Sequence, residues 1–110
     1  MPAQIILQQV GPLPIKQTFN APVDGPVTFF VAGTGRSPSA NNWIGVQIFV
    51  DDSLIGRLFV FCDQAQIHRS LIPNLISTNL SLGQHTMKLA PMNTNTLTDD
   101  NDGFVVTLLY

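Results

Sequence analysis

The stretch Ile44-Gly45-Val46-Gln47-Ile48-Phe49-Val50-Asp51-Asp52-Ser53-Leu54 decides the fold class. In its first part every second residue is apolar and β-branched. These residues are Ile44, Val46, Ile48 and Val50. Such alternation is typical of a strand with one side facing a core. The two aspartates that follow favour a tight turn, so the stretch predicts a hairpin of antiparallel strands.

Short apolar runs of the same kind recur along the chain, separated by Pro, Gly, Asn and Asp. They predict strands at about 4–9, 15–20, 26–33, 43–50, 54–62, 67–72, 75–80, 84–90 and 103–110. A second hairpin is predicted at Leu80-Ser81-Leu82-Gly83-Gln84, through Gly83. Turns recurring every 8–12 residues or so are typical of sandwiches. We therefore expect an all-β protein, a single jelly-roll-like antiparallel β-sandwich of about eight or nine strands, with one domain over residues 1–110.

Several predicted strands are apolar on both sides. In the final run Phe104, Val106 and Leu108 share one face, while Val105 and Leu109 point the other way. We expect this second face to be covered by another sheet, a loop or a neighbouring subunit. It therefore favours a homo-oligomer.

Composition excludes several classes of protein. Charged residues make up 11% of the chain and the net charge is −2, without a basic stripe, so no nucleic-acid partner is expected. No apolar run reaches the roughly 20 residues of a membrane span, which predicts no membrane insertion. Residues 1–10 lack the features of a signal peptide. We expect a soluble protein, cytoplasmic or released by a non-classical route.

Residues that carry chemistry are few. The chain has no glutamate, and no nucleophile elbow, phosphate-binding glycine loop or zinc-binding helix motif is present, so it is predicted not to be an enzyme. Cys62 is the single cysteine and follows an apolar run, which predicts a buried thiol. His85 alternates with the core-facing side of its strand and is interpreted as a hydrogen-bonded structural residue.

An acidic segment precedes the last strand. Asp99, Asp100 and Asp102 supply hard oxygen donors of the kind that calcium prefers, and Asn101 lies among them. We take the three aspartates as candidate calcium ligands and all four residues as candidate ligand contacts. The alternative is a plain solvated turn, which favours the same residue types.

A second candidate site follows the long loop 33–42. Tryptophan stacks well on the apolar face of a sugar, and amide side chains pair with hydroxyl groups. Asn41, Asn42 and Trp43 are therefore candidate ligand residues. The alternative is that Trp43 begins a core strand.

The run Leu82-Gly83-Gln84-His85-Thr86-Met87-Lys88-Leu89, followed by a loop and Asn101-Asp102-Gly103-Phe104-Val105-Val106, resembles small jelly-roll modules. These include bacterial soluble lectins of the calcium-dependent type and phage or appendage receptor-binding modules. The resemblance covers about the last quarter of the chain. It implies sugar recognition through an acidic loop near the C-terminus, at 98–102 here.

We expect a non-catalytic binding module, a multivalent homo-oligomeric lectin-like protein whose partner is a glycan or surface receptor. The alternative is a structural self-assembling subunit of a virion, phage or appendage. A small enzyme is a third hypothesis, for which the sequence has no positive feature. The working end is expected where loops 33–42 and 98–103 emerge, if the fold brings them together.

Overall fold

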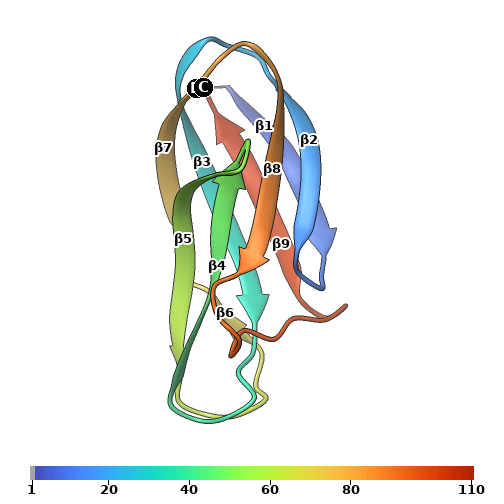
Figure 1. Cartoon of the computed structure of the whole chain (residues 1–110), viewed down its shortest axis with the longest axis vertical. Coiled ribbons are helices and arrows are strands. Elements are labelled where there is room, and N and C mark those ends of the chain that lie inside the picture. Colours follow the sequence, from blue (N-terminus) through green and yellow to red (C-terminus); the bar gives the residue numbers. More distant parts are fainter. Residues whose placement is uncertain (1) are drawn as a thin grey trace.

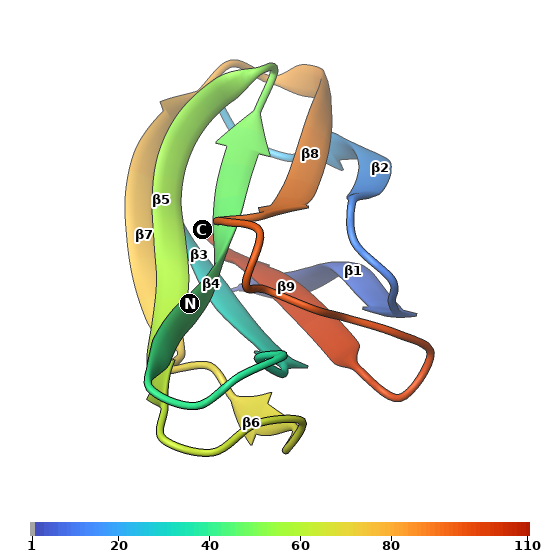
Figure 2. The same cartoon turned by 60° about the horizontal axis from the view of Figure 1, so that its bottom comes forward.

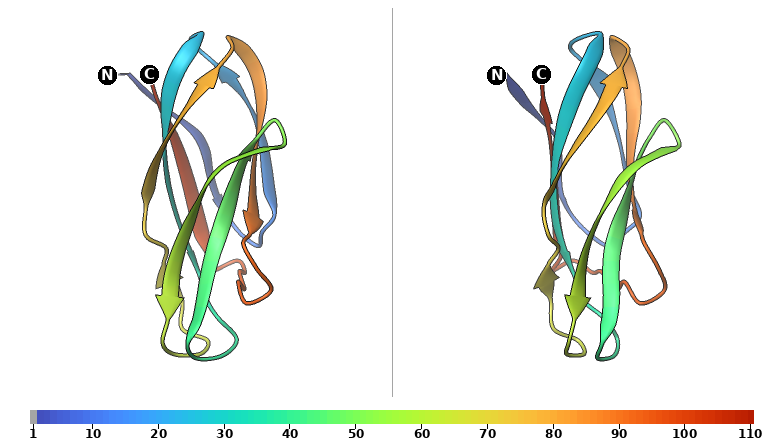
Figure 3. Two further views of the ribbon diagram at one scale, coloured as in Figure 1. Left: turned by 60° about the vertical axis from the view of Figure 1, so that its left-hand side comes forward. Right: turned by 90° about the vertical axis from the view of Figure 1, so that its left-hand side faces the viewer.

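The computed structural model describes residues 2–110, so Met1, the first residue of the predicted domain, lies outside it. Two antiparallel sheets face each other (Figure 1, Figure 3). One has the order β1-β9-β3-β6, with β7 also paired to β3, and the other has the order β2-β8-β4-β5. The strands described within residues 2–110 are β1 (Ala3–Val10), β2 (Ile15–Ala21), β3 (Gly25–Gly35), β4 (Asn42–Val50), β5 (Ser53–Cys62), β6 (Arg69–Ser70), β7 (Asn74–Leu80), β8 (Gly83–Pro91) and β9 (Gly103–Leu109). The predicted all-β antiparallel sandwich is confirmed.

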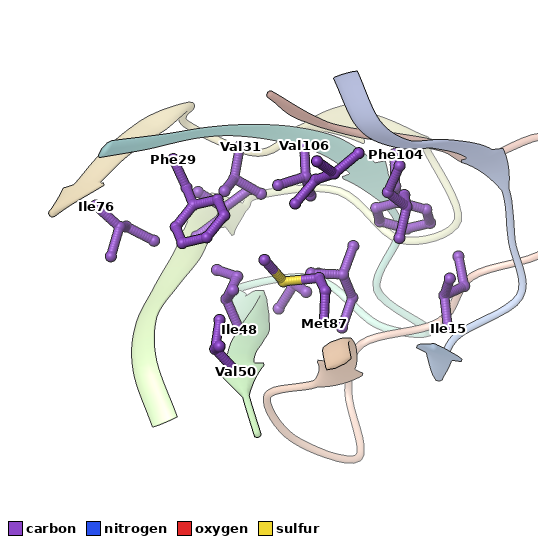
Figure 4. Close-up of a cluster of buried hydrophobic side chains, with 14 of the residues drawn as sticks. Ile15, Phe29, Val31, Ile48, Val50, Ile76, Met87, Phe104 and Val106 are labelled. Atoms are coloured by element: carbon purple, nitrogen blue, oxygen red, sulfur yellow. The ribbon is translucent and has the colours of Figure 1, made fainter. Parts of the chain in front are cut away.

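The space between the sheets is filled by the faces that alternation predicted. In the stretch 44–50 every second side chain is buried, and Ile48 has no exposed surface. Figure 4 shows Ile48 and Met87 of one sheet pointing toward Phe29 and Val106 of the other. Each such side chain contributes about 1.5–3 kcal/mol by leaving water. The buried residues of the last strand are, as predicted, Phe104, Val106 and Leu108.

The two predicted hairpins have different outcomes. The first is confirmed, since β4 pairs with β5 and the turn residues Asp51 and Asp52 have φ of 50° and 67°, as a tight primed turn needs. The second, at Leu80–Gln84, is wrong. Strand β7 pairs with β3 and β8 pairs with β2 and β4, so this segment crosses from one sheet to the other. A corner between sheets and a hairpin turn use the same residue types, here Gly83 at φ 115°.

The strand predicted at 67–72 is reduced to Arg69–Ser70. It pairs with the last two residues of β3, while β7 pairs with the earlier part of β3 from Asn74 onward. Pro73 lies between the two and has no N–H to donate, which interrupts the ladder.

The outer face of the β1-β9-β3-β7 region carries an apolar row. Ile5 and Phe30 are both paired with Thr107, and Phe30 is also paired with Leu75, so the side chains lie side by side on one face. Ile5, Phe30 and Leu75 are 60%, 38% and 61% exposed. These three side chains are exposed among residues 2–110, so a neighbouring subunit as their cover stays a prediction.

Within residues 2–110 no helix is both long and apolar enough to cross a membrane. The segments 33–42, 63–68 and 92–102 gather at one end of the sandwich (Figure 2). Arg36 links the first two of them through a 3.0 Å hydrogen bond from its Nε to Gln66 Oε1. This end holds most of the polar side chains discussed below.

Candidate functional site

The outer face of β5 carries two exposed phenylalanines. Leu58 and Cys62 point inward and are buried, so alternation turns Arg57, Phe59 and Phe61 outward. Phe59 and Phe61 are 43% and 42% exposed. Burial raises the pKa of the Cys62 thiol, which is buried as predicted. The apolar run before Cys62 is therefore divided between core and surface.

The register of the hairpin brings a third ring to this face. Trp43 on β4 lies directly opposite Phe61, and Gly45 lies opposite Phe59. The Trp43 ring meets Phe61 edge to face at a centroid distance of 5.3 Å and Phe59 at 5.7 Å. Trp43 is 52% exposed, so it begins a strand without entering the core. We call Trp43, Phe59 and Phe61 the aromatic patch.

A hollow of about 210 Å³ adjoins the patch and is lined by Trp43, Arg57, Phe59 and Met92. Gly45 makes room for Met92 there. A Cβ at Gly45 would lie 2.5 Å from the Leu58 carbonyl oxygen and 2.9 Å from Met92 Sδ. The missing side chain thus lets Met92 pack flat on the sheet.

The segment after β8 is fixed to β4 by hydrogen bonds. The Met92 backbone N–H donates to the Gly45 carbonyl at 2.8 Å, and Asn93 Nδ2 donates to the Trp43 carbonyl at 3.0 Å. Thr96 Oγ1 accepts from the Gly45 N–H at 3.0 Å and donates to Asn93 Oδ1 at 2.9 Å. These contacts satisfy backbone groups of β4 that no strand pairs. The patch therefore rests on a fixed backbone.

The free edge of β5 is partly covered. The Ile72 N–H donates to the Phe59 carbonyl at 3.3 Å, and Asn74 Nδ2 donates to the Arg57 carbonyl at 3.4 Å. A second hollow of about 200 Å³ lies here, lined by Arg57, Leu58, Phe59, Ile72, Pro73 and Asn74. Arg57 thus borders both hollows.

A polar cluster lies at the end of the sandwich, around Asp102, which has no exposed surface. Asp102 Oδ1 accepts from Thr34 Oγ1 at 2.9 Å and from His68 Nδ1 at 2.7 Å. Its Oδ2 accepts from the Asp99 backbone N–H at 2.9 Å. Arg36 Nη1 donates to Asp99 Oδ2 at 2.5 Å. We call Arg36, His68, Asp99 and Asp102 the carboxylate cluster.

The charge on Asp99 is stabilised within the cluster. Its carboxylate accepts a hydrogen bond from the Asn101 backbone N–H at 2.8 Å. This bond and the Arg36 guanidinium hold the pKa of Asp99 below its ordinary value. The group is therefore a carboxylate at neutral pH.

The cluster brings together part of the predicted calcium set. His68, Asp99 and Asp102 could each offer one ligand atom, all within 4.8 Å of one another, and Asp100 lies outside this group. Calcium takes six to eight oxygen ligands. Here the donors are one imidazole and two carboxylates that already accept hydrogen bonds from Arg36, His68 and backbone. As arranged, the residues fit calcium poorly, and the calcium site stays a prediction.

The other predicted contact residues lie in two places. Asn41 has a positive φ of 61°, and Asn42 Nδ2 donates to Ser37 Oγ at 3.2 Å, which folds the loop back on itself. Asn101 is exposed beside Asp99. Loops 33–42 and 98–103 do meet, through the Arg36–Asp99 pair. Trp43 lies apart from them and packs against Phe61 in the aromatic patch.

Sequence reasoning missed Arg57, Phe59 and Phe61 as surface residues. The signal was available, because Arg57 shares their alternation and a charged residue favours the outer face. It also missed the link from His68 to Asp102, for which no local pattern exists. The structural role predicted for His85 is confirmed, since it is 8% exposed and contacts Asp51 Oδ2 at 2.5 Å through Nδ1.

Comparison with known proteins shows a shared fold. No family model matches the sequence, and the search of curated proteins found no match. The structure is similar to the EclA C-terminal domain, a sugar-binding protein, with a TM-score of 0.52, 14% identity and coverage of 86% of this chain and 64% of that one. It is also similar to dimeric latent PorU from Porphyromonas gingivalis, with a TM-score of 0.54, 10% identity and coverage of 87% and 10%.

A looser likeness is to the carbohydrate-binding module CBM36 in complex with calcium and xylotriose, with a TM-score of 0.44, 14% identity and coverage of 98% and 87%. That score is too low to support a shared fold. For the two better matches, the chain spans 64% of the EclA domain and a tenth of PorU. At these identities the two better matches concern the fold and not the residues of a site.

Proposed function

We propose that this protein is a non-catalytic carbohydrate-binding module that binds sugar rings on the aromatic patch. The observation that carries the proposal is the exposure of three aromatic rings, Trp43, Phe59 and Phe61, on one face of a sheet. Aromatic faces pack against the C–H face of a sugar, and indole N–H groups donate to hydroxyl oxygens. The sugar-binding EclA domain shares the fold, which agrees with this function.

The surroundings of the patch support binding without catalysis. The hollow beside it is lined by Trp43, Arg57, Phe59 and Met92, which include no carboxyl or imidazole group. General acid–base chemistry on a bound sugar needs such groups within hydrogen-bond reach. A rigid sheet that presents the rings reduces the entropy lost on binding.

The acidic loop is kept as a second ligand surface. Asp100 and Asn101 are exposed there, next to Asp99 and Asp102 of the carboxylate cluster. Calcium bound at this loop would make sugar binding sensitive to a chelator. Binding at the aromatic patch would be insensitive, because the patch and its hollow hold no carboxylate.

The test is a glycan array run with and without a chelator, followed by calorimetry with the best ligand. For Trp43→Ala we expect the affinity to fall about tenfold, which corresponds to about 1.4 kcal/mol. Leu82→Ala, at a residue 67% exposed on the corner between β7 and β8, is the control and should bind normally. Normal binding by Trp43→Ala, or no binding to a broad array by folded protein, contradicts the proposal.

A second candidate function is a self-assembling structural subunit. It is favoured by the apolar row of Ile5, Phe30 and Leu75, since contiguous exposed apolar surface marks protein interfaces. The same row would serve a homo-oligomeric sugar-binding protein, whose linked patches gain avidity. Analytical ultracentrifugation separates the two, because a large assembly that binds no sugar favours the structural role. A small oligomer that binds sugar favours the first proposal.

A further inference from the structure

Arg57 is the cation that borders the aromatic patch. Its exposed side chain lines the hollow shared with Trp43 and Met92 and also the hollow beside Ile72. Gln47 lies directly opposite Arg57 in the β4–β5 register, so its amide shares the same outer face. The aromatic surface therefore has the charged Arg57 and the neutral polar Gln47 at its border.

Most other cations of the chain are already engaged. Arg36 pairs with Asp99 at 2.5 Å and Arg69 pairs with Asp63 at 2.6 Å. Lys88 Nζ lies 4.7 Å from the centre of the Phe49 ring. Within residues 2–110, Arg57 makes no ion pair and no side-chain hydrogen bond from its guanidinium. Its five N–H donors are free for a ligand.

The chemistry of a guanidinium decides which ligand would use it. The group is planar, always charged and matches the two oxygens of a carboxylate, or two oxygens of a sulfate, with parallel hydrogen bonds. A sugar ring packed on Trp43 and Phe59 would exclude water from one side of a charge pair at Arg57, which would strengthen the pair. A neutral sugar would leave this capacity unused.

We infer that the aromatic patch binds an anionic glycan, in which a sugar ring lies on Trp43 and Phe59 while its carboxylate or sulfate group pairs with Arg57. The inference rests on the proposed function of the patch and adds the charge of the ligand. It predicts a preference for polysaccharides built from uronic acids or sulfated sugars over neutral ones of the same backbone.

The experiment measures binding of the full chain by calorimetry to four polysaccharides. They are polygalacturonate, its fully methyl-esterified form, a sulfated galactan and a neutral galactan. We expect one or both anionic polymers to bind at least tenfold more tightly than their neutral counterparts, with affinity falling as salt is added. The comparison of polygalacturonate with the sulfated galactan identifies which anion Arg57 recognises.

Two variants make the test specific. Arg57→Gln should lose about tenfold in affinity for the preferred anionic polymer and keep its affinity for the neutral ones. Lys16→Gln is the matched control, because it removes the same charge from the outer face of β2 in the same sheet, where Lys16 also makes no ion pair within residues 2–110. Lys16→Gln should bind like the unaltered protein. Thermal unfolding of both variants checks that they are folded.

Equal affinity for anionic and neutral polymers overturns the inference and leaves the proposed function standing. An equal loss in Arg57→Gln and Lys16→Gln also overturns it, since the effect would then be general attraction by net charge. Absence of binding to all four polymers and to the glycan array contradicts the proposed function itself.

Discussion

The aromatic patch and the carboxylate cluster both lie on the surface of the sandwich, but they differ in how far their groups are already satisfied. In the cluster, the Asp102 carboxylate accepts three hydrogen bonds and Asp99 is paired with Arg36. In the patch, Trp43 exposes half of its surface and Arg57 has no anionic partner within residues 2–110. The acidic residues, which look functional in the sequence, connect loops. The phenylalanines, which look like core, are free for a ligand.

The comparison predicts that changes in the cluster alter stability and leave sugar affinity unchanged, while changes in the patch do the reverse. The largest effect is expected for Asp102→Ala. The change leaves the Thr34 hydroxyl, the His68 ring and the Asp99 N–H without their acceptor, and we expect the free energy of unfolding to fall by about 3–5 kcal/mol. Urea denaturation measures it.

Asp100→Ala is the control for that experiment. Asp100 is exposed and lies outside the group formed by His68, Asp99 and Asp102, so its free energy of unfolding should change by less than about 0.5 kcal/mol. If Asp102→Ala were as stable as the control, the structural role of the cluster would be refuted. Loss of sugar affinity in folded Asp102→Ala would instead make the acidic loop the ligand site.

An intermediate effect is expected at Gly45, where the free energy of unfolding and the sugar affinity should both change. In Gly45→Ala the new methyl group meets the Leu58 carbonyl oxygen and Met92 Sδ, and overpacking of this kind costs about 1–3 kcal/mol. Because Met92 lines the hollow beside Trp43, its displacement should also weaken sugar binding, which calorimetry measures. Gly103→Ala, at a glycine whose Cβ would meet nothing within 4 Å, is the matched control and should bind normally.

The smallest effect is expected for the pair of His85 and Asp51, whose side chains bind each other. His85 Nδ1 lies 2.5 Å from Asp51 Oδ2 and Nε2 lies 2.7 Å from the Ser81 carbonyl oxygen. Both partners are acceptors, so they favour the doubly protonated ring, and the bond to Asp51 raises the pKa of His85 above 6.5. The contribution of the protonated His85 ring to the free energy of unfolding is complete below pH 6.5. It is lost as the pH rises through the folded-state pKa.

We therefore expect the free energy of unfolding to decline as the pH rises above 6.5 through the folded-state pKa of His85, and His85→Gln to show a flatter profile in that range. The same bond lowers the pKa of Asp51, whose contribution is present above 3.8 and lost as the pH falls through the folded-state pKa. Denaturant titrations from pH 3 to 9 measure both limbs. An identical slope in His85→Gln would show that the pair is not responsible.

For β4 and β9, alternation was sufficient to predict both the strand and its core face, because burial on one side imposes a period of two. On β5 the apolar residues alone did not distinguish the sides, and only Arg57, which alternates with Phe59 and Phe61, marked the outer one. The polar contacts of Arg36 and His68 join segments distant in sequence, which no local pattern encodes.

The coverage of the β5 edge has a consequence for solubility. An edge strand with exposed aromatic side chains is a ready template for pairing with strands of other molecules, which leads to aggregation. Here the carbonyl groups of Arg57 and Phe59 are already occupied by Asn74 and Ile72. A second strand cannot add there without displacing them. The protein can therefore expose its aromatic rings in water while two carbonyl groups of the backbone beside them are already occupied.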